Sequence, residues 1–286
     1  MWWRASRSAA PHTRSPRDQG HAAAGGSGGA DQLPQTRASP TSLDYSLPMH
    51  KPSEPATASS CAAGGPPTPQ PERTVIALHG HCGARHHCVG IGAAHWRRGA
   101  NVLLFDQRRR GSSEGELVSL GHLETLDALA AVGYARSRAP GLPLGLIGYS
   151  MGASVAVMAA AREERVGAIV ADSPFASERE LVRSLLRRQI GPLHGPVVAL
   201  TERLLPYDPG EVEPLREVAK VAPRASLFVH GLLDETCDPK DSVRLYEAAE
   251  EPKELWLLEG AGHCDAYFAD REAYCGRVGV FLEAHL

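Results

Sequence analysis

The sequence lacks an excess of charge of either sign. Its 30 Lys and Arg residues face 33 Asp and Glu residues, which gives a formal net charge of −3 over 286 residues. It also contains no long basic run. Proteins that bind nucleic acid gather Lys and Arg on one face to meet the phosphates. The charge pattern therefore predicts no nucleic-acid partner.

Long apolar runs are also missing, so the sequence predicts no membrane span. The N-terminus lacks the apolar core of a secretory signal. Its arginines precede the first acidic residue, Asp18, a composition that resembles an organelle transit peptide. A start assigned too far upstream, with Met49 as an alternative start, explains the same feature and is the preferred interpretation. Cytoplasm is the expected location.

No pair of cysteines has the CxxC spacing of a redox or zinc motif. Without an export signal, the cysteines are expected to be free thiols. The chain has six: Cys61, Cys82, Cys88, Cys237, Cys264 and Cys275.

Large apolar residues are scarce in residues 1–72, which are rich in Ala, Gly, Ser, Pro and Arg. Such a segment cannot bury enough surface to offset its ordering entropy. We expect residues 1–72 to be a disordered low-complexity segment. Residues 73–286 are long enough for one α/β domain with a sizeable core.

From residue 73 onward, short apolar runs alternate with longer segments of helical spacing. Continuous apolar strands separated by helices are typical of a parallel sheet covered on both faces. The sequence therefore predicts a three-layer α/β sandwich. The expected strands are 75–78, 102–105, 144–147, 166–171, 226–229 and 255–258, and the expected helices are 86–98, 121–138, 152–162, 238–250 and 268–285.

One motif carries the chemistry. The apolar run 144–147 leads into Gly148-Tyr149-Ser150-Met151-Gly152, and an alanine-rich segment follows. A Gly-x-Ser-x-Gly motif between a strand and a helix is typical of a nucleophile elbow, which exposes the serine Oγ on a strained turn. Gly148 and Gly152 provide the small residues that this turn needs. The alternative is an ordinary turn with a capping serine.

A serine nucleophile needs a histidine base and a carboxylate that orients the base. Asp234 follows the expected strand 226–229, and His263 follows the strand 255–258. Asp238 is a competing acid, although its position before Pro239 is typical of a helix N-cap. Asp172 ends a strand and is a second competitor, whereas Asp265 is too close to His263 in sequence to be its partner.

Residues 74–286 resemble the α/β-hydrolases of the serine esterase and lipase-like type. They are similar to the small-cap bacterial branch related to cinnamoyl esterases, monoglyceride lipases and S9-type peptidases. Six segments carry the resemblance: 78–80, 106–115, 148–152, 171–175, 230–234 and 262–263.

The resemblance implies Ser150 as nucleophile, Asp234 as acid and His263 as base. The loop opened by His79 and Gly80 would contribute to the oxyanion hole, whose donors would be the backbone N–H groups of His81 and Met151. Asp106 and Arg108 would brace this loop.

About fifty residues separate the expected strands 166–171 and 226–229, where one helix would suffice. Leucines and valines alternate there with Arg183, Arg187 and Arg188, a pattern of amphipathic helices. We expect a short helical cap, about residues 176–222, after the fourth recognisable strand. A lid over an acyl pocket and a helical excursion packed on the core both remain open.

Some features do not fit the main interpretation. Histidines and cysteines crowd residues 79–88, but their spacing is not that of a structural zinc site, and a histidine-rich oxyanion loop is preferred over a metal site. The antiparallel strands that usually precede the His-Gly loop in relatives have no counterpart in residues 41–72. Arg108, Arg109 and Arg110 are expected to form a basic surface turn.

The sequence as a whole predicts a serine hydrolase that cleaves a small or medium carboxylic ester through an acyl-enzyme. No cofactor is expected, the partner is the small-molecule ester, and the protein is expected to be a monomer or weak homodimer. A peptidase or acyltransferase with the same triad is the first alternative. A non-catalytic binding protein of the same fold is the second.

Overall fold

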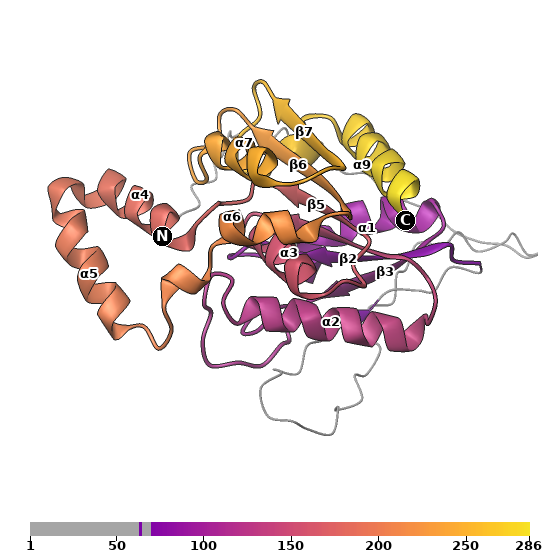
Figure 1. Ribbon diagram of the computed structural model, residues 1–286, viewed down its shortest axis with the longest axis horizontal. Coiled ribbons are helices and arrows are strands. Elements are labelled where there is room, and N and C mark those ends of the chain that lie inside the picture. The colour runs from indigo at the N-terminus through magenta and orange to yellow at the C-terminus, as the bar shows by residue number, and fades with distance from the viewer. Residues whose placement is uncertain (1–62, 65–69) are drawn as a thin grey trace, which may run out of the picture. The chain divides into compact units, whose positions relative to one another are not determined.

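The computed structural model describes residues 63–64 and 70–286. The predictions for the remaining N-terminal residues, including disorder, the transit-like composition, Met49 and Cys61, lie outside this part of the chain. The described residues form a seven-stranded sheet in the order β1-β3-β2-β4-β5-β6-β7 (Figure 1). The strands are β1 Ala63–Gly64, β2 Arg73–Leu78, β3 Ala100–Phe105, β4 Leu144–Tyr149, β5 Ala168–Asp172, β6 Ala225–Gly231 and β7 Lys253–Leu258.

Strands β2 to β7 are parallel to their neighbours, and only the pair of β1 with β3 is antiparallel. In that pair Ala63 lies opposite Phe105 and Gly64 opposite Leu104. The sequence predicted no strand in this stretch, because a two-residue strand is too short to show an alternating apolar pattern. The six predicted strands correspond to β2 to β7.

Two hydrophobic cores lie on the two faces of the sheet. Along β2, Ile76 and Leu78 contribute to one core and Val75 and Ala77 to the other, because successive side chains of a strand point to opposite faces. Helices α2, α3 and α7 cover the first face, and α1 and α9 cover the second. This confirms the predicted three-layer sandwich.

The helices agree with the predicted segments except near the C-terminus. There the expected helix 268–285 is divided into α8 and α9 by Asp270, whose carboxylate accepts a hydrogen bond from the Ala273 N–H and caps α9. The helices of the two faces are α1 Val89–Arg97, α2 Glu124–Arg138, α3 Met151–Arg162, α7 Pro239–Ala248, α8 Ala266–Ala269 and α9 Arg271–His285.

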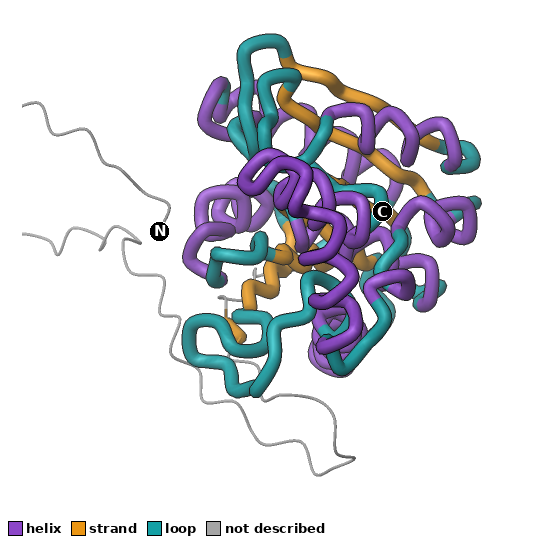
Figure 2. Tube along the Cα trace, turned by 90° about the vertical axis from the view of Figure 1, so that its left-hand side faces the viewer, coloured by secondary structure: helices purple, strands orange, loops and turns teal. Residues whose placement is uncertain are grey.

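The segment between β5 and β6 is largely helical. It contains α4 Glu178–Ile190, α5 His194–Leu204 and α6 Pro214–Glu217, with 3-10 turns at Gly191–Leu193, Pro209–Glu211 and Val218–Val221. A further 3-10 turn, Arg85–Cys88, precedes α1. Helices α4 and α5 pack against each other beside the sheet at the left of Figure 1, and helices lie in front of the strand ends in Figure 2.

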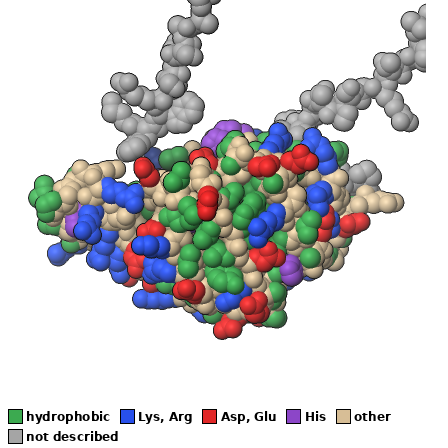
Figure 3. All heavy atoms as spheres, turned by 90° about the horizontal axis from the view of Figure 1, so that it is seen from above, with side chains coloured by type: hydrophobic (Ala, Val, Ile, Leu, Met, Phe, Trp, Pro, Cys, Tyr) green, Lys and Arg blue, Asp and Glu red, His purple; other side chains and the backbone are tan. Residues whose placement is uncertain are grey.

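Basic side chains gather on the outer surface of this helical pair, at the left of Figure 3. Arg183, Arg187 and Arg188 of α4 are all exposed. The apolar positions Leu181, Val182 and Leu185 are half-buried. The predicted amphipathic pattern of this segment is therefore present in α4.

Candidate active site

Ser150 lies on the sharp turn that joins β4 to α3. Its backbone angles are φ 54° and ψ −120°, a conformation that costs a non-glycine residue about 1–3 kcal/mol. A Cβ atom on Gly148 would lie 2.1 Å from the carbonyl oxygen of Gly152, and one on Gly152 would lie 2.3 Å from that of Leu78. Glycine is therefore required at both positions for strand and helix to approach this closely.

The loops after β6 and β7 bring Asp234 and His263 to this serine. Nε2 of His263 lies 2.9 Å from the Ser150 Oγ, and Nδ1 of the same ring lies 2.6 Å from Oδ2 of Asp234. With Nδ1–H donating to the carboxylate, Nε2 is the acceptor for the serine hydroxyl proton. The structure thus brings together the three side chains that the sequence predicts as nucleophile, base and acid.

The carboxylate of Asp234 is buried and receives several hydrogen bonds. Its Oδ1 accepts from the backbone N–H groups of Thr236 and Cys237, at 2.7 and 3.0 Å. Its Oδ2 is contacted by Nε2 of His230 at 3.1 Å, in addition to His263. Burial would raise the pKa of Asp234, but the bonds from His230 and His263 and from the Thr236 N–H outweigh it and hold this pKa well below its usual range. Asp234 is therefore ionised.

The loop after β2 lies directly against the serine. His79 is buried, its Nδ1–H donates to the Gly80 carbonyl at 2.8 Å, and its Nε2 accepts from the Gln107 N–H at 3.0 Å. Burial also lowers the pKa of His79, so the ring is the neutral tautomer. A Cβ atom on Gly80 would lie 3.3 Å from the Ser150 Cβ. A glycine therefore lets this loop pass close to the nucleophile position.

The two predicted oxyanion donors directly follow, in sequence, the two residues of this contact. His81 follows Gly80 in the loop, and Met151 is the first residue of α3. Within residues 63–64 and 70–286, the backbone N–H groups of both residues are without a hydrogen-bond acceptor. The positive end of the α3 dipole also favours negative charge near Ser150.

Several known proteins are similar to this chain in sequence. A family model described as serine aminopeptidase, S33, matches residues 69–206. The uncharacterized protein YqkD of Bacillus subtilis is 32% identical over 193 residues, which cover 65% of this chain and 63% of YqkD. Rv2307c of Mycobacterium tuberculosis, also uncharacterized, is 30% identical over 211 residues, which cover 73% of this chain and 69% of that protein.

A solved structure extends the similarity to the fold. The Pyrococcus furiosus esterase Pf2001 superimposes with a TM-score of 0.63 and 26% sequence identity, over 75% of this chain and 84% of that chain. The chain belongs to the α/β-hydrolase superfamily. It spans a little under two thirds of the length of the first curated relatives that it matches, 63% for YqkD.

In this α/β-hydrolase, the other carboxylates considered as acids have different partners. Asp238 accepts a hydrogen bond from the Lys240 N–H and caps α7, as predicted. Asp172 is fully buried and accepts from the hydroxyls of Ser173 and Tyr274. Asp265 accepts, through its backbone carbonyl, from the N–H groups of Phe268 and Ala269 in α8. The contact with His263 is made by Asp234.

Asp106 and Arg108 fix the loop that follows β3. Asp106 accepts from the backbone N–H groups of Arg85 and Ser112, at 2.7 and 3.1 Å, and so ties this loop to the one that carries His81. The guanidinium of Arg108 forms a bidentate pair with Asp127 of α2, at 2.9 and 2.8 Å. Arg108 is therefore buried and paired, whereas the sequence placed it in a basic surface turn. Only Arg109 of the three arginines is exposed.

The histidine- and cysteine-rich stretch after β2 serves several separate purposes. His79 is held by Gly80 and Gln107, while His86 and His87 pack edge to face, with ring centroids 4.2 Å apart. Among the described residues, no group of three or more His, Cys, Asp or Glu side chains is arranged to hold a metal ion. The described cysteines are free thiols, with Cys61 outside this part of the chain.

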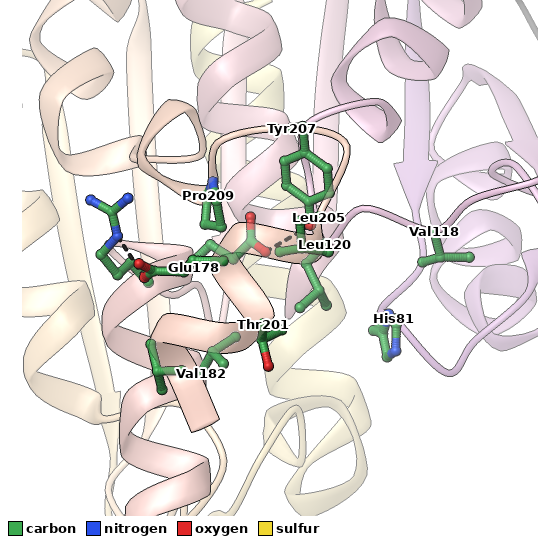
Figure 4. A pocket seen from close by; sticks show the side chains of 12 residues that line it. His81, Val118, Leu120, Glu178, Val182, Thr201, Leu205, Tyr207 and Pro209 are labelled. Carbon is green, nitrogen blue, oxygen red and sulfur yellow. Dashed lines mark hydrogen bonds and ion pairs between the residues drawn. The ribbon is translucent and has the colours of Figure 1, made fainter. Parts of the chain in front are cut away.

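A cavity of about 190 Å³ lies between the helical segment and the loops after β2 and β3 (Figure 4). Its wall is mostly apolar, with Val118 and Leu120 on one side and Val182, Val198 and Leu205 on the other. His81 also lines it, so the cavity reaches the loop beside Ser150.

No helix of the described chain is both long and apolar enough to cross a membrane.

Sequence reasoning missed three contributors to this site. His230 contacts the carboxylate of Asp234, and its place at the end of β6, four residues before an acid, was the available clue. Ser173 accepts a hydrogen bond from the N–H of Cys264, which follows His263, at 3.0 Å. Tyr274 donates to Asp172 from the distant helix α9 at 2.8 Å, a contact that no local spacing indicates.

Proposed function

We propose that this chain is a serine hydrolase that cleaves a small or medium carboxylic ester through an acyl-enzyme intermediate. One observation carries the proposal: a single imidazole, that of His263, lies 2.9 Å from the Ser150 hydroxyl and 2.6 Å from the Asp234 carboxylate. The similarity to an esterase of known structure supports it. The proposed activity is of the carboxylesterase or lipase-like type.

In the first step, the Ser150 Oγ attacks the ester carbonyl carbon while Nε2 of His263 takes the hydroxyl proton. The resulting imidazolium is stabilised by the ionised Asp234, which also keeps the ring in the correct tautomer. The carbonyl oxygen becomes an oxyanion next to the N–H groups of His81 and Met151. Removing one such donor typically costs about 3–4 kcal/mol of transition-state stabilisation.

In the second step, the tetrahedral intermediate collapses. The bond between carbon and the leaving oxygen breaks, and the proton on Nε2 passes to the departing alcohol. A water molecule then enters, gives a proton to His263 and attacks the acyl carbon. Collapse of this second intermediate returns the proton to the Ser150 Oγ and releases the carboxylic acid. Apart from the ester substrate, only the protein and water take part in these steps.

Labelling by a fluorophosphonate probe tests the proposal. The probe reacts with an activated serine, so we expect the wild-type chain to be labelled and Ser150→Ala not to be labelled. Ser137→Ala is a matched control, because Ser137 lies on the exposed side of α2 and donates to the Tyr134 carbonyl. Equal labelling of wild type and Ser150→Ala would refute the assignment of the nucleophile. No labelling of the wild type would favour a non-catalytic binding protein.

A peptidase is the second candidate, because the matching family model is described as serine aminopeptidase, S33. The same triad would then attack an amide carbonyl. Rates on a matched ester and amide with the same acyl group separate the two. The acyltransferase alternative is tested by adding excess alcohol, which competes with water for the acyl-enzyme. Formation of a new ester in place of the acid would indicate transfer.

A further inference from the structure

The cavity beside the helical segment is lined by a buried polar group that has an unused hydrogen-bonding atom. Glu178, the first residue of α4, lines the cavity and is only 2% exposed. Its Oε1 accepts a hydrogen bond from the Tyr207 hydroxyl at 2.8 Å, drawn as a dashed line in Figure 4. Its Oε2 is buried and has no partner in the part of the chain that the structure describes. A buried carboxyl oxygen without a partner is unfavourable, so a ligand group that bonds to it would be favoured.

The other charged groups of the cavity are already paired. Arg179 contacts Glu202 at 2.9 Å and Asp208 at 2.8 Å. Much of the remaining wall consists of aliphatic side chains, among them Val182, Val198 and Leu205, with the polar side chains of Thr201 and His81 also present. The cavity therefore suits an aliphatic group that carries one polar atom at a fixed position.

The location of the cavity decides which part of an ester would enter it. In the sheet, the strand that leads to His81 lies on one side of β4, and the strands that lead to Asp234 and His263 lie on the other. The leaving alcohol must receive its proton from His263, so it departs on the side of β7. The acyl group stays bonded to Ser150, so it must lie on the other side, that of β2, where His81 borders the cavity.

We propose that this cavity binds an aliphatic acyl chain and that Oε2 of Glu178 forms a hydrogen bond with a hydroxyl group on that chain. The substrates would then be esters of hydroxylated aliphatic acids. This inference rests on the proposed esterase function and adds the class of acid that the enzyme selects. It also assigns the helical segment, about residues 176–222, the role of a cap over the acyl pocket.

A hydroxyl group fits Glu178 better than a charged group. Burial raises the pKa of Glu178 to about 7, against the lowering effect of the Tyr207 bond, so both protonation states are populated near neutral pH. A hydroxyl can donate to the ionised carboxylate and accept from the protonated one. An ammonium group would lose its partner whenever Glu178 is protonated, and a carboxylate would be repelled whenever it is ionised.

The test compares p-nitrophenyl esters of one chain length with and without a hydroxyl group. Hexanoate is compared with its analogues hydroxylated on the third and on the terminal carbon, where spontaneous lactone formation is slow. We expect kcat/KM of the wild type to be about tenfold higher for at least one hydroxylated ester, because the hydroxyl group supplies a hydrogen bond that the buried Oε2 otherwise lacks. The ratio of kcat/KM for a hydroxylated ester to kcat/KM for hexanoate does not depend on the amount of active enzyme.

Variants assign the preference to Glu178. Glu178→Leu is expected to abolish the preference, and Tyr207→Phe, which leaves Oε2 in place, is expected to keep it. Glu180→Leu is the matched control, because Glu180 lies on the exposed side of the same helix and pairs with Arg244. A preference for the hydroxylated ester that is retained in Glu178→Leu would overturn the inference. If Glu178→Leu does not fold, the inference is still tested by the wild type and by Tyr207→Phe, which should both prefer the hydroxylated ester.

The outcomes separate this inference from the proposed function. Hydrolysis of all esters with a ratio close to one means that water satisfies Oε2, and then the inference fails while the esterase proposal stands. An absence of both ester hydrolysis and fluorophosphonate labelling means that both fail.

Discussion

His230 contacts the same oxygen atom of Asp234 that His263 contacts. Nε2 of His230 lies 3.1 Å from Oδ2 and 3.2 Å from the Cys237 carbonyl oxygen, and its Nδ1 lies 2.7 Å from the Ser242 hydroxyl. Two acceptors around Nε2 place a proton there, and Nδ1 then accepts from Ser242. His230 is fully buried, so this arrangement is rigid. It fixes the position of the Oδ2 atom that also contacts the proposed base.

Replacing His230 by Gln is expected to lower kcat by about 10- to 100-fold with little change in KM. The reason is that a hydrogen bond to a charged group is worth about 1.5–3 kcal/mol, and its loss frees Asp234 to move away from His263. Steady-state kinetics on a p-nitrophenyl ester measure both constants. His285→Gln, at an exposed position near the end of α9, is the control. An unchanged kcat in His230→Gln would show that the two backbone N–H groups alone hold the carboxylate.

Substituting Asp234 is expected to lower kcat, whereas substituting Asp238 is expected to lower folding stability. Asp234→Asn replaces the carboxylate by a neutral amide, which no longer holds the imidazole in the correct tautomer or stabilises its charged form, and losses of about 10⁴-fold in kcat are known for this change in a serine protease triad. Asp238→Ala removes the N-cap of α7 and is expected to cost about 1 kcal/mol of folding stability while kcat is retained. Kinetics and urea denaturation of both variants check this. A large loss of kcat in Asp238→Ala would reverse the assignment.

The glycines differ sharply in how they tolerate a methyl group. Gly152→Ala places a Cβ 2.3 Å from the Leu78 carbonyl oxygen, so strand and helix must separate. We expect a loss of more than about 2 kcal/mol in the free energy of unfolding. Gly133→Ala is the matched control, since its Cβ meets nothing within 4 Å on the exposed face of α2. It should stabilise the protein by about 0.5–1 kcal/mol, because alanine favours the helix. Equal stabilities would contradict the close backbone packing at the elbow.

The pH dependence of stability is expected to report the buried Asp172. Burial raises its pKa from the usual 3.8 to about 6, although the bonds from Tyr274 and Ser173 oppose this. The folded state therefore binds the proton more tightly than the unfolded state. This contribution to stability is fully present below about pH 4 and is lost as the pH rises through about 6. Asp172→Asn is expected to remove this part of the pH dependence, measured as the urea midpoint between about pH 4 and 7. A slope identical to that of the wild type would mean that Asp172 is ionised throughout.

The sheet and the three main site residues could be predicted because each rests on a local pattern. Continuous apolar runs mark β2 to β7, and the flanking glycines mark the turn at Ser150. Asp238 was recognisable as a cap from the proline that follows it. Chain order then indicated Asp234 and His263.

The supporting contacts could not be predicted because they join residues that are distant in sequence. The partner of Arg108, Asp127, comes from α2, and nothing in the basic run 108–110 indicates a buried pair. Glu178 reads as an ordinary acidic residue at the start of a helix, and only the position of Tyr207 shows that one of its oxygens is bonded and the other is not. The two-residue strand β1 is defined solely by its pairing with β3.

The proposed base is attached to the margin of the sheet. His263 follows β7, which among the described strands has β6 as its sole neighbour. Fraying of that one ladder carries the imidazole away from Ser150 while the central strands stay paired. Warming should therefore abolish the proposed activity before the rest of the fold unfolds, and amide hydrogen exchange should be faster in β7 than in β4. Thermal inactivation would then measure how firmly a single outer strand is held, and overall stability would be a poor guide to how long the proposed activity lasts.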